Sequence, residues 1–193
     1  YEVGIKYQPP GYDSSVTLSA FDLTQKNVTT ADPVNSGYSV QSGEVRSRGV
    51  EVEGKASLTN NLNVLGSYAY TDARITRDNQ YQGNTPRAIP RHTAGVWLDY
   101  TIDAGVFDGV GAGIGQRYMG SSQNIQNTLK VPHYTLTDAT LRYDLGKVGL
   151  QGSKISITAT NLFDKRYFEP GFYEDSVLSG SRRNVIATLS HDW

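Results

Sequence analysis

The clearest structural signal in the sequence is the segment Arg91-His92-Thr93-Ala94-Gly95-Val96-Trp97-Leu98-Asp99-Tyr100-Thr101-Ile102. Its even positions are mostly apolar or aromatic, whereas its odd positions are mostly polar or glycine. A period of two residues is typical of a β-strand whose two faces meet different surroundings. The segment is about twice as long as an average strand of a globular protein. It therefore predicts a sheet built from unusually long strands.

The same alternation recurs along the chain and predicts an all-β protein. Besides residues 91–102, it occurs in residues 1–7, 16–23, 50–58, 62–70, 110–118, 139–145, 155–163 and 185–193. No segment shows the apolar stripe of an amphipathic helix. We therefore expect nine strands and no helix.

The connections between these strands alternate in length. Short turn-like segments span residues 8–13, 59–61, 103–109 and 146–153, and long polar segments span residues 29–43, 75–90, 121–132 and 164–181. Short turns on one side, long loops on the other and strands of about ten residues are typical of outer-membrane barrels. We therefore predict a transmembrane antiparallel β-barrel. A soluble solenoid, propeller or sandwich is the less favoured alternative.

Aromatic residues gather at both ends of the predicted strands. The short-turn ends carry Tyr7, Tyr100, Tyr143 and Trp193, and the long-loop ends carry Tyr68, Tyr70, Tyr118, Tyr134 and Tyr167. Aromatic belts mark the two membrane–water interfaces of barrel proteins. The positions of these residues agree with the barrel prediction.

Composition excludes several classes of function. The 193 residues carry 18 basic and 19 acidic side chains, so a general nucleic-acid binder is not expected. The absence of cysteine excludes a thiol nucleophile and a cysteine-ligated metal. His191 lies at the opposite strand end from His92 and His133, so the three histidines are not expected to share a metal ion. With no G-x-S-x-G motif either, we predict neither an enzyme nor a metal site.

A run of alternating glycines spans residues 109–115. It lacks the G-x-G-x-x-G spacing and the following helix of a phosphate-binding loop. On one face of a strand, glycines permit close approach of another backbone. We interpret the run as a smooth stretch of the barrel lumen against which a separate domain could lie.

Four motifs carry a family resemblance: Ile89-Pro90-Arg91-His92-Thr93, Gly115-Gln116-Arg117-Tyr118-Met119-Gly120-Ser121, Val131-Pro132-His133-Tyr134-Thr135-Leu136 and Asn161-Leu162-Phe163-Asp164-Lys165-Arg166-Tyr167. With them, the chain resembles the C-terminal barrel of TonB-dependent siderophore receptors of the ferric-hydroxamate (ferrichrome and ferrioxamine) type. One departure is the absence of cysteine from residues 169–180, where hydroxamate-type members often have a pair.

The resemblance implies that residues 1–193 are the C-terminal part of a larger barrel. Family barrels have about 22 strands, of which this chain would supply about nine, without the N-terminal strands and the plug domain. Strand parity agrees, because nine antiparallel strands closed on themselves would pair the first and the last in parallel. Residues 1–7 and 181–193 would otherwise remain unpaired edges in lipid.

The resemblance also implies the function. The protein would be a receptor and transporter for Fe(III)-siderophore uptake in the outer membrane of a Gram-negative bacterium, surrounded by outer-membrane lipid and without a covalently bound cofactor. Energy would come from the TonB–ExbB–ExbD system through the N-terminal part. A passive porin or structural barrel is the alternative, and a soluble β-rich binding domain is a third possibility.

Two groups of residues are candidates for the site. The resemblance implies ligand contacts from aromatic side chains of the outer loops, for which the candidates are Tyr81, Tyr118, Phe172 and Tyr173. Charged residues on the polar face of the strands are expected to face the lumen and the plug; they are Glu51, Glu53, Asp99, Arg117 and Arg142.

Overall fold

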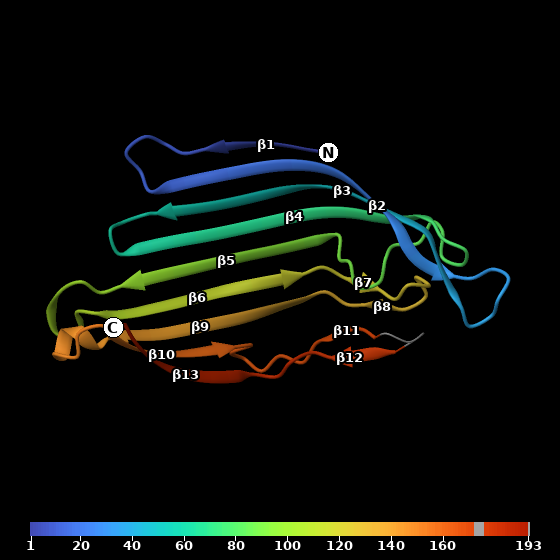
Figure 1. Ribbon diagram of the computed structural model, residues 1–193. Helices are drawn as coiled ribbons and strands as arrows, with labels where there is room; N and C mark the ends of the chain where they lie inside the picture. Colours follow the sequence, from blue (N-terminus) through green and yellow to red (C-terminus); the bar gives the residue numbers. More distant parts are fainter. Residues whose placement is uncertain (172–175, 193) are drawn as a thin grey trace.

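The protein is one long antiparallel sheet, seen from the side in Figure 1. The computed structural model describes residues 1–171 and 176–192. Within these residues the sheet has nine strands in the order β1-β2-β3-β4-β5-β6-β9-β10-β13, which confirms the predicted all-β class and strand number. Their bounds are β1 (Glu2–Tyr7), β2 (Ser14–Ala31), β3 (Ser39–Ser57), β4 (Leu62–Arg77), β5 (His92–Thr101), β6 (Val110–Met119), β9 (Tyr134–Asp144), β10 (Ser153–Thr160) and β13 (Asn184–His191).

Smaller elements occupy the connections. Two short hairpins lie in the long loops: β7 (Ser122–Gln123) with β8 (Lys130–Val131), and β11 (Phe168–Pro170) with β12 (Val177–Ser179). Two 3-10 turns, η1 (Gly105–Phe107) and η2 (Leu145–Val148), lie in short connections. Among the described residues, none of the helical segments is long or apolar enough to cross a membrane.

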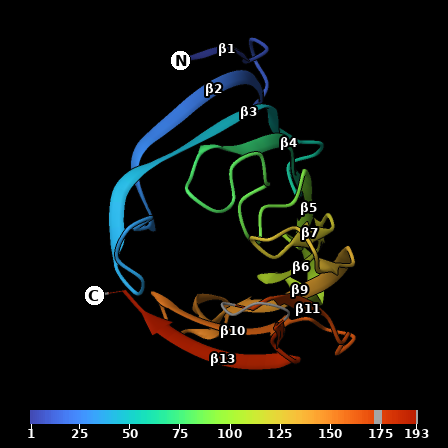
Figure 2. The ribbon, with the colours of Figure 1, turned by 90° about the vertical axis from the view of Figure 1, so that its right-hand side faces the viewer.

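The sheet is strongly curved. Figure 2 shows the nine strands as an arc, with the green loop between β4 and β5 folded inside it. The convex face carries exposed apolar side chains, among them Leu18, Val52, Leu98, Ile114 and Leu141. The few buried apolar residues, Ala73, Ile75, Val131 and Leu136, lie at the long-loop end of the sheet. The fold is thus part of a barrel wall whose apolar side faces outward.

Four strands extend further than the alternation predicted: β2, β3 and β4 at their long-loop ends, and β9, which begins at Tyr134. β2 and β3 pair as far as Ala31 and Ser39, and β4 continues to Arg77, so parts of the expected loops are strand. Side-chain alternation depends on having one apolar environment and one wet one, and it is lost in the outer parts of β2 and β3, where both faces meet water. In the outer part of β4 it changes face, because Ala73 and Ile75 are buried on the concave side. The backbone ladder needs no such contrast, and here it continues through irregularities between Lys26 and Thr30.

Two strand ends are shorter than predicted. β10 stops at Thr160, because Asn161 and Asp164 take positive φ angles of 49° and 53°. Phe163 therefore lies outside the strand, with 74% of its surface exposed. At the other side of the sheet, Leu145 begins η2 and does not continue β9.

The aromatic belts are only partly as predicted. Tyr7, Tyr100 and Tyr143, together with Tyr68, Tyr70 and Tyr118, share the convex face with the apolar residues through the strand register. Tyr134 has the same parity as Asp138, however, and lies on the concave face with Tyr167 packed against it. The assignment of these two tyrosines to a membrane belt is wrong. Trp193 lies outside the described residues.

Candidate functional site

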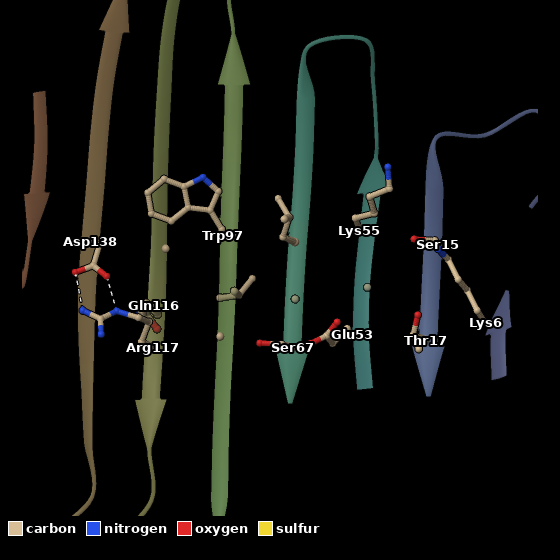
Figure 3. Close-up of a pocket in the computed structure, with 16 residues that line it drawn as sticks. Lys6, Ser15, Thr17, Glu53, Lys55, Ser67, Trp97, Gln116, Arg117 and Asp138 are labelled. Carbon is tan, nitrogen blue, oxygen red and sulfur yellow. Dashed lines mark hydrogen bonds and ion pairs between the residues drawn. The ribbon is translucent and has the colours of Figure 1, made fainter. Parts of the chain in front are cut away.

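The concave face holds the polar side chains of the central strands. Cross-strand pairing places Glu53 opposite Ser67, Ser67 opposite Gly95, and Gly95 opposite Arg117, which forms one row across β3, β4, β5 and β6. A hollow of about 650 Å³ opens over this row. Figure 3 shows the side chains that line it. Charged and aromatic residues line it, including Lys6, Glu53, Lys55, Trp97, Arg117 and Asp138.

Two bidentate ion pairs fasten the wall beneath the hollow. The Arg117 Nε and Nη2 atoms donate to the Asp138 carboxylate at 2.6 and 3.2 Å, as drawn in Figure 3. Arg142 donates to both oxygens of Asp99 at 2.6 Å, and its Nη2 also reaches Thr101 Oγ1 at 2.8 Å. Such paired, charge-assisted hydrogen bonds are the strong and geometrically specific ones. Three of the five predicted lumen charges therefore have partners within the wall.

The glycines of residues 109–115 leave room for side chains of neighbouring strands to lie across β6. Arg142 on β9 reaches Asp99 on β5 by crossing β6 at Gly111, where a Cβ atom would lie 2.5 Å from Arg142 Nε. The indole of Trp97 covers Gly113 and Gly115 in the same way, with a Cβ at either position 2.4 Å from a ring carbon. The space over these glycines is thus filled by side chains of the wall itself. The interpretation as a bare surface for a separate domain is wrong.

The two remaining lumen charges differ from the others. Glu51 and Glu53 lie on β3 with the concave-face parity, and Glu53 lines the hollow. Within residues 1–171 and 176–192, neither carboxylate makes a hydrogen bond or an ion pair. Their charge is available to a partner that approaches the concave face.

The predicted ligand-contacting aromatics do not come together. Tyr118 is on the convex face beside His133, with ring centroids 5.9 Å apart, because its neighbour Arg117 takes the concave side. Tyr81 is half-buried in the loop after β4, where its N–H donates to Asp78 Oδ1 at 2.7 Å. Phe172 and Tyr173 lie outside the described residues.

The sequence reasoning missed an aromatic pair at the mouth of the concave face. The rings of Tyr134 and Tyr167 lie 4.3 Å apart at 35°, and Tyr134 Oη donates to Glu169 Oε1 at 3.2 Å. Tyr134 lies two residues before Leu136 in the sequence, nearer the long-loop end of β9. Leu136 is the cross-strand partner of Arg117. Tyr134 and Asp138 both occupy even positions of β9, and this shared parity is the signal in the sequence that places Tyr134 on the concave face. The pair offers an aromatic surface next to the Arg117 guanidinium.

The long loops form a connected rim above this pair. Asn127, at a φ of 59°, accepts from the Thr85 N–H at 2.8 Å and donates to the Thr85 carbonyl at 2.9 Å, as a strand neighbour would. Asn84 Nδ2 donates to the Ile125 carbonyl at 2.9 Å, and Arg87 Nη1 to the Pro170 carbonyl at 3.2 Å. The loops after β4, β6 and β10 are therefore linked to one another.

An ion pair holds the loop that follows β10. The Arg182 guanidinium hydrogen-bonds the Asp164 carboxylate, and the Arg183 N–H donates to the same group at 3.0 Å. These contacts, with Arg182 the larger cause, hold the pKa of Asp164 well below its usual range. The carboxylate is thus charged across the physiological pH range.

A curved antiparallel sheet, apolar outside and polar within, with linked loops at one end, defines the wall of an outer-membrane β-barrel. The chain belongs to the TonB-dependent receptor family: the family model described as "TonB dependent receptor-like, beta-barrel" matches residues 1–162. The barrels of this family lie in the outer membrane of Gram-negative bacteria, which agrees with the predicted location.

Individual relatives agree with this membership. The chain is 46% identical over 191 residues to the ferrichrome outer membrane transporter/phage receptor of Escherichia coli K12, covering 98% of this chain and 26% of the relative. It is 33% identical over 192 residues to the ferrioxamine B receptor of Salmonella typhimurium, covering 98% and 27%. The chain thus spans about a quarter of the length of these relatives.

Solved structures share the fold. The siderophore receptor PiuA from Acinetobacter baumannii superposes with a TM-score of 0.77 at 22% identity, covering 97% of this chain and 27% of that one. The ferric preacinetobactin receptor BauA from the same species also reaches a TM-score of 0.77, at 24% identity, covering 100% of this chain and 29% of that one. The open sheet of this chain is therefore a segment of a larger barrel. The relatives that these comparisons name are receptors and transporters.

Proposed function

We propose that this chain is the C-terminal part of the barrel of an outer-membrane receptor that imports an Fe(III)-siderophore complex. The observation that carries the proposal is the 46% identity to a ferrichrome transporter across almost the whole chain. In this proposal the TonB–ExbB–ExbD system energises transport through the N-terminal part of the protein. The ferric complex is cargo, and the barrel wall itself holds no cofactor.

The concave face supplies the surface for a plug domain contributed by the rest of the receptor. Glu51 and Glu53 are the wall charges that would pair with plug cations, because they have no partners among the described residues. Asp99, Arg117 and Arg142 are fixed within the wall and would instead preserve its shape. This division refines the five lumen charges into two contact residues and three structural ones.

The proposed ligand surface is the Tyr134–Tyr167 pair, with Tyr81 in the loop above. Two tyrosine rings packed against each other provide a rigid apolar surface at small cost in side-chain entropy, which suits a bulky ferric chelate. Arg117 lies next to this surface, and its ion pair with Asp138 fixes the wall behind the two rings. Tyr118 is not included, because it faces the opposite side.

The test uses the full-length receptor gene in a bacterial strain that lacks its own hydroxamate receptors. We expect uptake of radioactive Fe(III)-ferrichrome that disappears when TonB is deleted. The double variant Tyr134→Ala/Tyr167→Ala should bind ferrichrome at least about tenfold more weakly, as expected for two aromatic contacts. Tyr118→Ala is the matched control and should bind normally.

The outcomes separate the parts of the proposal. Uptake that persists without TonB, together with ion conductance in planar bilayers, would establish the passive porin in its place. Normal TonB-dependent uptake by the double tyrosine variant would retain the transport function and refute the ligand surface.

A further inference from the structure

A carboxylate lies at the edge of the tyrosine pair at the mouth of the concave face. It belongs to Glu169 on β11, in the hairpin at the long-loop end of the sheet (Figure 1). Glu169 Oε1 accepts from Tyr134 Oη at 3.2 Å, and the Tyr134 ring packs against Tyr167. Glu169 is exposed, and both tyrosines are half-buried. We name Tyr134, Tyr167 and Glu169 the mouth site.

The negative charge of Glu169 is not neutralised by the part of the chain that the structure describes. Among residues 1–171 and 176–192, no arginine, lysine or histidine forms an ion pair with it. Its hydrogen bond comes from the uncharged Tyr134 hydroxyl, which leaves the carboxylate charge in place. The second carboxylate oxygen is available to a donor that approaches from outside.

The cations on the neighbouring elements are directed elsewhere. The Arg117 guanidinium, which lies beside the two rings, donates both of its hydrogen bonds to Asp138. Arg87 Nη1 donates to the Pro170 carbonyl at 3.2 Å. Lys130 is on β8, which packs against β11, but it forms no ion pair with Glu169 within the described ranges. An anionic ligand at the mouth site would therefore meet a free carboxylate of the same sign.

A protonated amine fits the chemistry of the mouth site. The face of a tyrosine ring attracts a cation through the negative side of its quadrupole. A primary ammonium also has three N–H donors, so it can hydrogen-bond Glu169 while it lies over a ring. Hydrogen bonds between an ammonium and a carboxylate are stronger than those between neutral groups. Two rings next to one carboxylate thus form a small cation-binding surface.

We propose that the mouth site binds a protonated amine carried by the ferric chelate, so that the receptor prefers a cationic siderophore complex to a neutral one. This inference rests on the proposed function and adds a charge preference to it. An Fe(III) trihydroxamate is neutral, because its three anionic groups balance the metal charge. A pendant amine would give such a complex its positive charge, with Glu169 as the residue that determines specificity.

The test compares two chelates that differ in this one charge. Ferrioxamine B is a trihydroxamate with one protonated amine, and acetylation of that amine makes it neutral. Binding of the Fe(III) complexes to the purified full-length receptor is followed by quenching of tryptophan fluorescence. The wild-type receptor should bind the cationic chelate about tenfold more tightly than the acetylated one.

The variant Glu169→Gln removes the charge but keeps an oxygen that can accept from Tyr134 Oη. It should bind the cationic chelate about tenfold more weakly and the acetylated chelate within about twofold of wild type. Comparing both chelates on both proteins cancels the effect of the added acetyl group, because its bulk is the same in each.

Glu44→Gln is the matched control. Glu44 Oε1 also accepts from a hydroxyl, Thr76 Oγ1, at 2.8 Å, but Glu44 lies on β3, separated from β9 by β4, β5 and β6. This variant should keep the wild-type preference. Heat-modifiable migration in electrophoresis verifies that both variants are folded barrels.

Ionic strength supplies an independent readout. Raising NaCl from about 0.05 M to about 0.5 M should weaken binding of the cationic chelate to the wild-type receptor more than binding of the acetylated one, because salt screens an exposed ion pair. In Glu169→Gln the two chelates should respond to salt alike.

Two results would overturn the charge preference alone. One is equal affinity of the wild-type receptor for the two chelates. The other is an equal loss of both in Glu169→Gln, which is expected if Glu169 only holds the Tyr134 ring in place. Failure of the proposed function has a different signature: neither chelate binds, and TonB-dependent uptake of ferrichrome is absent. That result would overturn both proposals.

Discussion

Replacing Gly113 by alanine should destabilise the barrel wall through a single steric contact. The new Cβ would lie 2.4 Å from Trp97 Cζ2, 2.9 Å from Trp97 Cε2 and 3.0 Å from Thr140 Cγ2. Carbon atoms in favourable contact lie about 3.5–4.0 Å apart, so the indole must move by roughly 1 Å. Overpacking of this kind costs about 1–3 kcal/mol, and alanine recovers up to about 1 kcal/mol by restricting the unfolded chain. We expect a net loss of about 1–2 kcal/mol in the free energy of unfolding.

The same geometry predicts which glycine can be rescued. At Gly113 every close neighbour is a side-chain atom, so Gly113→Ala combined with Trp97→Leu should regain most of the loss measured against Trp97→Leu alone. At Gly115 the Cβ would also lie 2.5 Å from the Val96 carbonyl oxygen, a backbone atom that shortening Trp97 does not move. Gly115→Ala should therefore remain destabilising in the Trp97→Leu background.

The assay is urea-induced unfolding of the full-length receptor in lipid vesicles, followed by tryptophan fluorescence and by electrophoretic mobility. Gly66→Ala is the control, because it is also in a strand interior and its Cβ would meet only the Gly95 carbonyl oxygen at 3.9 Å. If Gly113→Ala is as stable as Gly66→Ala, or if the Trp97→Leu background does not relieve it, the packing of Trp97 over the glycine run is refuted.

Three further predictions concern the ion pair across β6 and the loops. Asp99→Asn should lower the free energy of unfolding by about 1–2 kcal/mol, because it removes the carboxylate charge that pairs with Arg142 across β6. The urea assay described above measures this loss. Asn127→Ala should speed tryptic cleavage of residues 78–91 and 120–133, because alanine loses both hydrogen bonds to the neighbouring loop and does not favour a φ of 59°. Asp164→Asn should speed hydrogen exchange near Arg182 at neutral pH. Because the folded pKa is depressed, the wild-type protection should persist above about pH 3.9 and disappear only as the pH falls through that lower pKa.

Alternation could predict the faces of the sheet because a barrel wall separates two solvents along its whole length. It placed Glu53 and Arg117 on the same side as the hollow that the structure shows. It failed for β2 and β3 beyond about Lys26, where water on both sides removes the contrast and backbone pairing alone extends the strands.

The contents of the site were harder to predict, because they depend on cross-strand neighbours that are distant in sequence. Arg142 and Asp99 are 43 residues apart, and only the register that brings β9 next to β6 and β6 next to β5 joins them. Tyr118 is predicted as a ligand residue only from being a tyrosine near a long loop, whereas its parity places it on the outer face. For Tyr134 the same parity rule identifies the inner face.

The distribution of charge on the concave face matches the mechanical task of the proposed receptor. A plug that rearranges during transport needs contacts that part at little cost, while the surrounding wall must keep its shape. Exposed single carboxylates such as Glu51 and Glu53 form ion pairs worth only about 0–1 kcal/mol in water, so they separate easily. The bidentate pairs of Arg117 with Asp138 and of Arg142 with Asp99 connect β5, β6 and β9 to one another. These arginines therefore need no partner on the plug. The wall can therefore remain rigid at the hollow while the contacts facing it break and re-form.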